Sequence, residues 1–221
     1  MPPSRDRSDA DIGAFADAVF GGRPFVGTAA VAAGVLTAHD LRVRFTRVLP
    51  GIHLVRGAEL DAHARVRAAA LWAPPGAVVA GFAAALLHRE PHLAEEAVHR
   101  VVDLYVPRAA RAPRGIRVRQ VRHPFRAGEL IVVDGLTCTS PERTALDLAR
   151  WERDPEEAII AVDAVCNATS TPVARVGAHA RELSGLHGRQ RVLGLLPRCD
   201  HRTDSPPETR LRLRFEDSGM P

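Results

Sequence analysis

A chain of 221 residues, 46% of them hydrophobic, can form one large domain or two small ones without disulfide or metal support. The longest apolar run, 78–87, is too short to span a bilayer, and the first residues lack the apolar stretch of a secretory signal. We therefore expect a cytoplasmic protein with no membrane partner. The net charge is +4, every basic side chain apart from histidine is arginine, and the spacing of Cys138, Cys166 and Cys199 predicts free thiols.

The first 57 residues contain clear start and stop signals for helices and one hairpin turn. These signals predict a helix over 8–20 capped by Ser8, and a short helix over 29–33 capped by Thr28 and ended by Gly34. A third helix is predicted over 38–44, capped by Thr37 with Asp40 as its capping-box partner. A hairpin of 46–49 and 52–55, turned by Pro50 and Gly51, follows.

Helix, short helix, helix and hairpin is the element order of a winged helix-turn-helix, although a small helical bundle followed by a hairpin has the same pattern. In the first interpretation, the helix over 38–44 enters the major groove of DNA and the hairpin contacts the backbone or the minor groove. The candidate DNA-binding residues are polar or basic side chains of these two elements: Thr37, His39, Arg42, Arg44, Arg47 and His53.

The middle of the chain alternates between helical and extended patterns. It predicts a helix over 59–73, a strand over 77–79, a buried helix over 81–87, strands over 98–106 and 115–121, and a hairpin over 132–139 turned by Asp134 and Gly135. The strands predict a mixed or antiparallel sheet of about four strands. Ile116 and Val118 are expected to point inward, and Arg117 and Arg119 outward.

The helix after this hairpin has two possible caps, Ser140 with Pro141 in the first turn or Thr139 with Glu142. Its apolar residues define one face, and Arg143, Asp147 and Arg150 are expected to lie off that face. Four further helices are predicted: one over 154–168, one that begins at 171–172 and ends at 184–185, one over 189–196, and one over 209–216 with Ser205 and Glu208 in capping-box register.

Seven arginines and no acid occur between Tyr105 and Arg126, whereas acids outnumber bases between Glu142 and Asp163. The basic run predicts either a surface that grips phosphates or an acidic protein, or a solvated face balanced by the acidic helices. The residues of this candidate surface are Arg108, Arg111, Arg114, Arg117, Arg119 and Arg122.

No pattern in the chain indicates catalysis. His88 and His92 have the spacing of a helical zinc pair, but Pro91 between them breaks the required helix. Cys199 and His201 lack further ligands at usual spacing, and the nucleophile and phosphate-binding motifs are missing. The sequence therefore predicts a non-enzyme with no catalytic residue, no metal site and no cofactor.

Three segments carry a family likeness: RVLPGIHLV from Arg47, AGFAAALLH from Ala80 and VVDGLTCTSPERTALDLA from Val132. Together they resemble the AbiEi-type antitoxins of type IV toxin–antitoxin systems. The resemblance implies an α+β fold, with a winged helix-turn-helix in 1–57 and a mixed α/β domain with a small sheet and C-terminal helices in 58–200. The segment 201–221 is similar to the opening helix of a Vsr-like endonuclease-related domain, truncated before its active-site residues.

The resemblance implies a transcriptional autorepressor that binds double-stranded DNA of its own promoter region and counters a nucleotidyltransferase-like toxin. Two alternatives stay open. One is a protein-interaction module that binds an acidic partner or toxin through the arginine-rich face, and the other is an inactive remnant of a nuclease fusion. The sequence leaves the oligomeric state undetermined. In the endonuclease-like segment Glu208 matches a glutamate near the metal site, but its expected role here is a helix cap.

Overall fold

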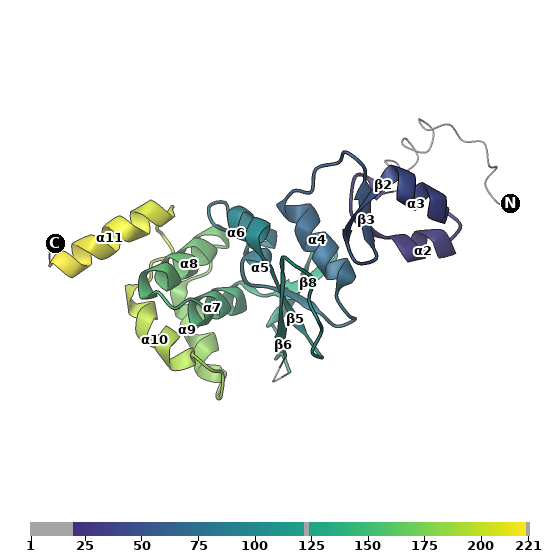
Figure 1. Cartoon of the computed structure of the whole chain (residues 1–221). Helices are drawn as coiled ribbons and strands as arrows, with labels where there is room; N and C mark the ends of the chain where they lie inside the picture. The colour runs from purple at the N-terminus through teal and green to yellow at the C-terminus, as the bar shows by residue number, and fades with distance from the viewer. Residues whose placement is uncertain (1–19, 122–123, 220–221) are drawn as a thin grey trace.

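The computed structural model describes residues 20–121 and 124–219 and shows an elongated α+β molecule with two sheets (Figure 1). The helices α3 and α11 lie at opposite ends of this molecule. The helix predicted over 8–20 falls outside the described residues except for Phe20. In the part that the structure describes, no helix combines the length and the apolar character needed to cross a bilayer.

A three-stranded antiparallel sheet and two short helices form the first unit, with strand order β1-β3-β2. Its elements are β1 (Phe25–Val26), α2 (Gly27–Ala32), α3 (Ala38–Arg44), β2 (Phe45–Leu49) and β3 (Ile52–Val55). The rings of Phe20 and Phe25 stack 3.9 Å apart, and Phe45 meets Phe25 edge-on at 5.1 Å. This aromatic cluster fixes the helices on the hairpin.

The predicted hairpin and α3 are confirmed, but the predicted start of α2 is wrong. The helix begins at Gly27, and its N-cap is Val26, which makes no side-chain capping bond, so Thr28 is not the cap. The N–H of Gly27 instead donates to the carbonyl of Gly51 at 2.9 Å. The hairpin turn therefore satisfies the helix start, a contact that no local sequence signal encodes.

The helix α4 (Ala62–Trp72) joins the two sheets, because it packs against β1, β2 and β3 on one side and against β4 and β5 on the other. It starts three residues later than predicted. Asp61 sets the start by accepting the Ala64 N–H at 2.7 Å.

The second sheet is mixed and has five strands in the order β6-β5-β4-β8-β7. Its strands are β4 (Val78–Ala80), β5 (Val102–Val106), β6 (Ile116–Gln120), β7 (Leu130–Val133) and β8 (Leu136–Thr139). The expectation of about four strands is one too few, because the short β4 lies in the centre. It pairs antiparallel with β5 and parallel with β8.

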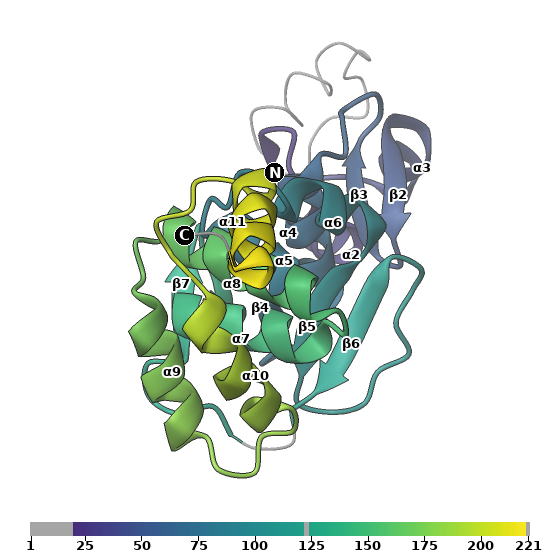
Figure 2. The same cartoon turned by 90° about the vertical axis from the view of Figure 1, so that its left-hand side faces the viewer.

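Helices cover the second sheet and form the larger core with it, and Figure 2 shows α7, α9 and α10 on its near side. These helices are α5 (Gly81–Leu87), α6 (Ala94–Arg100), α7 (Pro141–Trp151), α8 (Pro155–Ala168), α9 (Val173–Glu182), α10 (Arg189–Leu195) with the 3-10 turn η1 (Leu196–Arg198), and α11 (Pro206–Ser218).

The strand predicted over 98–106 is wrong in its first part, which belongs to helix α6. The buried carboxylate of Glu90 accepts the backbone N–H groups of His92, Leu93 and Ala94 at 2.7–2.8 Å. Three otherwise unpaired donors are thus satisfied at the helix start, which favours a helix over the extended form. The strand begins only at Val102.

The structure selects one of the two predicted caps of α7 and corrects the predicted cap of α11. Ser140, not Thr139, caps α7 by accepting the Arg143 N–H at 3.3 Å, with Pro141 in the first turn. At α11 the predicted capping box is wrong, because the Ser205 side chain makes no capping bond. The Glu208 carboxylate accepts the N–H of Asp204 at 3.0 Å instead.

The polar face predicted for α7 is buried rather than exposed, because Arg143 is 7% exposed and Asp147 is fully covered. The Arg143 guanidinium binds Glu129 and lies 3.0 Å from Asp147 and 3.1 Å from the Tyr105 hydroxyl. These partners come from β5, α7 and the loop before β7. A set of opposite charges thus joins the sheet to the helical layer.

The prediction of free thiols is confirmed for Cys138, Cys166 and Cys199. Burial raises the pKa of the Cys138 thiol to about 11 and that of Cys166 to about 12. At neutral pH both are therefore protonated, and each behaves as a small apolar side chain.

Candidate nucleic-acid interface

The helix α3 is fixed at its start by a complete capping box. Thr37 Oγ1 accepts the Asp40 N–H at 3.1 Å, and the Asp40 carboxylate accepts the Thr37 N–H at 2.8 Å. Burial disfavours the charged carboxylate, but the bonds from Thr37 and the nearby Arg44 hold the pKa of Asp40 below its usual range. This confirms the predicted box and gives a short helix a defined first turn.

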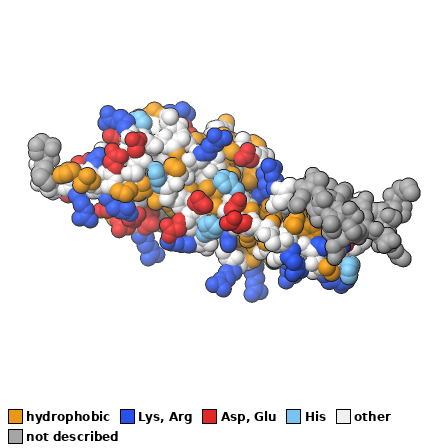
Figure 3. Space-filling model, turned by 90° about the horizontal axis from the view of Figure 1, so that it is seen from above, with side chains coloured by type: hydrophobic (Ala, Val, Ile, Leu, Met, Phe, Trp, Pro, Cys, Tyr) orange, Lys and Arg blue, Asp and Glu red, His pale blue; other side chains and the backbone are white. Residues whose placement is uncertain are grey.

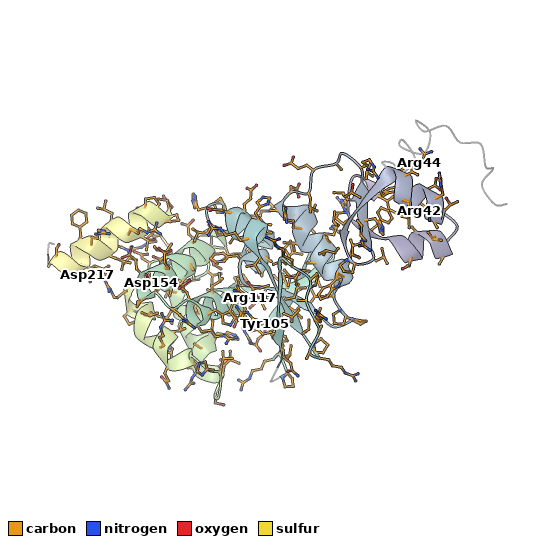
Figure 4. All side chains as sticks on the ribbon, viewed as in Figure 1. Arg42, Arg44, Tyr105, Arg117, Asp154 and Asp217 are labelled. Carbon is orange, nitrogen blue, oxygen red and sulfur yellow. The ribbon has the colours of Figure 1, made fainter. Side chains whose placement is uncertain are left out.

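One face of α3 is exposed to solvent, and Leu41 on the opposite side packs into the aromatic cluster. The exposed side chains are Ala38, His39, Arg42 and Val43, the last 49% exposed. The sequence prediction of outward-facing Thr37, His39 and Arg42 is therefore confirmed. Figure 4 shows Arg42 and Arg44 at the end of the molecule opposite Asp217.

The unit around α3 is strongly basic. Between Phe20 and Ala58 the chain has five arginines and one carboxylate, Asp40. Arg42 and Arg47 are exposed, whereas Arg44 is half-buried and pairs with Asp40 at 3.5 Å. Three arginines of α3 and β2 thus remain on this unit as predicted, but Arg44 also has a structural role.

Sequence reasoning missed Arg56, which follows the hairpin. Its guanidinium donates to the carbonyls of Val43 at 3.0 Å and Arg42 at 3.2 Å. These two carbonyls belong to the last turn of α3, where cationic groups are favourable. Arg56 therefore fixes α3 against the hairpin and adds positive charge beside Arg42.

His53, another predicted site residue, is not fully exposed. Its ring is half-buried, with the ring centroid 6.1 Å from that of Phe25. A Cβ placed on Gly27 would come within 2.5 Å of His53 Nδ1, so the glycine makes room for the imidazole. Burial lowers the pKa of His53, which keeps the ring neutral at neutral pH. It supports the base of α2 rather than presenting charge.

The predicted arginine-rich surface divides into two parts. Arg108, Arg111 and Arg114 are exposed on the loop between β5 and β6. Arg117 and Arg119 both bind the buried carboxylate of Asp103 on the neighbouring strand, at 2.6 Å and 3.0 Å. The Arg117 side chain is still 50% exposed, as predicted, whereas that of Arg119 is only 24% exposed. Arg122 lies outside the described residues. The expected uniform basic face is therefore corrected to a basic loop beside a charge-paired strand.

Acidic side chains are concentrated away from the α3 end. On the face shown in Figure 3, red side chains lie over the middle of the molecule and over the half that carries α11, where blue side chains lie among them, and blue and pale-blue side chains lie at the other end beside the grey atoms.

His88 and His92, considered as a zinc pair, each lie within hydrogen-bond distance of a backbone carbonyl. His88 Nε2 lies 2.8 Å from the Thr139 carbonyl, and His92 Nε2 lies 2.9 Å from that of Asp204. Within residues 20–121 and 124–219, no group of three or more His, Cys, Asp or Glu side chains is arranged to hold a metal.

The geometry therefore brings His39, Arg42, Val43, Arg47 and Arg56 onto one basic unit, and leaves Arg108, Arg111 and Arg114 on a separate loop. Compared with known proteins, no family model matches this chain, and no curated protein has a significantly similar sequence.

Proposed function

We propose that this protein is a DNA-binding transcriptional regulator that contacts double-stranded DNA through α3 and the β2–β3 hairpin. The observation that carries the proposal is the exposed face of α3, which combines Arg42, His39 and Val43 on a unit with five arginines and one carboxylate. In this proposal α2 and α3 form a helix-turn-helix and the hairpin is its wing. The element order and the outward face support that reading.

The side chains of this face suit the edges of bases in the major groove. An arginine can donate two hydrogen bonds to guanine O6 and N7, and apolar groups such as Val43 and Ala38 can contact the methyl group of thymine. Arg47 and Arg56 flank the helix, where phosphates of the backbone would lie. Each residue thus has a separate role, base contact for the first set and positioning for the second.

The resemblance to AbiEi-type antitoxins supports a more specific version of the proposal. The protein would bind its own promoter region in the cytoplasm and act as the antitoxin of a type IV system, opposite a nucleotidyltransferase-like toxin. The five-stranded sheet and its helices would then form the antitoxin domain. In this version the protein has no catalytic activity of its own.

Replacing Arg42 with alanine is expected to weaken binding to DNA from the region upstream of the gene by about 5- to 150-fold, because a base contact worth about 1–3 kcal/mol is lost. Arg47→Ala should weaken binding to all duplexes alike and reduce the slope of log affinity against log salt by about 1. Fluorescence anisotropy over a series of salt concentrations measures both effects.

Arg214→Ala provides the matched control, since Arg214 is exposed on α11 at the other end of the molecule and its removal changes the net charge equally. This control should bind DNA as the unchanged protein does. Equal losses in Arg42→Ala and Arg214→Ala, or no binding by the unchanged protein at low salt, would show that α3 is not a DNA-reading helix.

A second function has its own observation, the three exposed arginines of the β5–β6 loop, which have no ion pair within the described residues. Such a loop fits an acidic protein partner such as a cognate toxin. The triple variant Arg108→Ala, Arg111→Ala and Arg114→Ala should then lose co-purification with a toxin expressed from the neighbouring gene, while DNA affinity stays unchanged. Co-purification that survives the triple variant refutes this role.

A further inference from the structure

A pocket of about 320 Å³ opens where the edge strand β6 meets helices α5 to α8, far from the α3 face. Its apolar walls come from four helices and include Phe82, Ala97, Leu148 and Ala161. At about 30 Å³ for each water-sized group, the space holds roughly ten non-hydrogen atoms. This volume suits a small organic molecule and is too narrow for a polypeptide segment.

Two arginines and a tryptophan form the polar side of this pocket. Arg117 binds Asp103 with two hydrogen bonds, from Nε at 2.6 Å and from Nη2 at 2.7 Å. Arg119 donates its Nε–H to the same carboxylate at 3.0 Å, and its guanidinium lies 3.5 Å from the ring centre of Trp151. Asp103 and Trp151 thus hold both guanidinium groups in fixed orientations at the pocket.

The charges of the Arg117, Arg119 and Asp103 cluster do not balance. Within the described residues, Arg117 and Arg119 share a single carboxylate, that of Asp103, so one positive charge is left over. The Nη1 of Arg117 and both Nη groups of Arg119 have no acceptor among the described residues. The Arg117 side chain is 50% exposed and that of Arg119 is 24% exposed, so these N–H groups can donate to a further anionic group at the mouth of the pocket.

The acidic side chains at the rim do not supply this missing charge, because each has another partner. Glu96 pairs with Arg100 at the surface, and Glu157 pairs with Arg210 of α11 at 2.6 Å. Glu152 keeps its negative charge and accepts the backbone N–H groups of the next two residues, but it forms no ion pair with Arg117 or Arg119 within the described residues. The excess positive charge is therefore local to Arg117 and Arg119.

We propose that this pocket binds a small apolar monocarboxylate. Its carboxylate would accept hydrogen bonds from the free N–H groups of Arg117 and Arg119, and its hydrocarbon or aromatic body would lie against Phe82, Leu148 and Ala161. A single negative charge neutralises the surplus of one guanidinium, whereas a neutral molecule leaves it unpaired and a dianion exceeds it. The close approach of Trp151 and Asp103 to Gly81 keeps this arrangement rigid: a Cβ there would lie 3.0 Å from the indole and 3.2 Å from the carboxylate.

Phenylacetate is a suitable probe, because it has one carboxylate and about the size of the pocket. Titrations followed by ligand-detected NMR with the full chain should show saturable binding of phenylacetate. Phenylacetamide, which has the same shape without the charge, and acetate, which lacks the ring, should each bind at least about tenfold more weakly, since hydrogen bonds to charged groups and apolar burial are both needed.

Arg117→Gln removes the surplus charge while Arg119 continues to bind Asp103, so the fold should persist. Its affinity for phenylacetate should fall about tenfold. Arg114→Gln is the matched control, since this exposed arginine lies on the preceding loop and outside the pocket, and it should bind as the unchanged protein does. Ala97→Phe should fill the pocket and abolish binding.

The proposal is overturned if phenylacetate shows no saturable binding, if phenylacetamide binds as tightly, or if Arg117→Gln and Arg114→Gln have the same affinity as the unchanged protein. Circular dichroism of each variant shows whether the fold is retained. If Arg117→Gln fails to fold, two measurements still test whether phenylacetate binds in this pocket. They are the comparison of phenylacetate with phenylacetamide and the affinity of Ala97→Phe.

Discussion

Replacing Arg143 with methionine is expected to lower the free energy of unfolding by about 3–5 kcal/mol, because breaking a buried ion pair leaves uncompensated charges behind. Glu129 is 1% exposed and Asp147 is fully covered, and both lie within bonding distance of Arg143. The Arg143 guanidinium also lies 5.0 Å from the Phe125 ring, so its removal opens space as well. Urea unfolding at pH 7, followed by circular dichroism, measures the loss.

Arg175→Met is the control for this experiment. Arg175 also forms an ion pair with a glutamate of α7, Glu142, at 2.6 Å, but its side chain is 69% exposed. Such a surface pair contributes at most about 1 kcal/mol. If Arg143→Met were no less stable than Arg175→Met, the buried charges would be compensated by groups other than Arg143, and the network would not join the sheet to the helical layer.

Much of the fold could be predicted because the signals are local. The capping box of Thr37 and Asp40, the Pro50–Gly51 and Asp134–Gly135 turns, and the Ser140 cap with Pro141 all involve residues within four positions of one another. Such contacts form in the same way wherever the segment lies in the chain, so they can be recognised without knowledge of the tertiary structure.

The errors arise where a distant or buried group determines the local structure. The hairpin carbonyl of Gly51 satisfies the start of α2 from a distant part of the chain. Glu90 lies only two to four residues from the N–H groups that it binds at the start of α6, but it can accept all three only because its carboxylate is buried against the helix. The apolar alternation of 98–106 favoured a strand, but three hydrogen bonds to one buried carboxylate outweigh that preference. The short β4 could be located, but its central place in the sheet depends on strand pairing over long sequence distances.

The candidate site shows the same division. His39 and Arg42 were predicted on the outward face because helical periodicity places them opposite Leu41. Arg56 was missed because its partners lie 13 and 14 residues away. Arg117 and Arg119 were predicted as outward from strand alternation within β6 alone. That alternation does not show which residues of β5 lie opposite, and in the structure the buried Asp103 lies opposite Arg117. Charge pairing across a sheet is set by register, which single-sequence reasoning does not give.

Lowering the pH from 6 to 3 is expected to remove about 2 kcal/mol of stability through Glu129 alone. Burial disfavours the charged carboxylate, but hydrogen bonds from His179, the Arg126 N–H and Arg143 outweigh burial and lower the pKa of Glu129 from 4.5 to about 2. Because the folded pKa is depressed, the contribution is complete above the unfolded value of 4.5 and is lost as the pH falls toward 2.

Other groups titrate in the same range, so the test compares the protein with Glu129→Gln. Asp163, for example, has a pKa raised by burial to about 6, and its contribution has the opposite sign: it is present below 3.8 and is lost as the pH rises through 6. The difference in unfolding free energy between the unchanged protein and Glu129→Gln cancels such terms and should shrink by about 2 kcal/mol between pH 6 and pH 3.

Glu182→Gln, at an exposed position of α9, is the control: its unfolding free energy should differ from that of the unchanged protein by the same amount at pH 6 and pH 3. A constant difference for Glu129→Gln as well would mean that Glu129 titrates alike in the folded and unfolded chain, contrary to the buried network around Arg143.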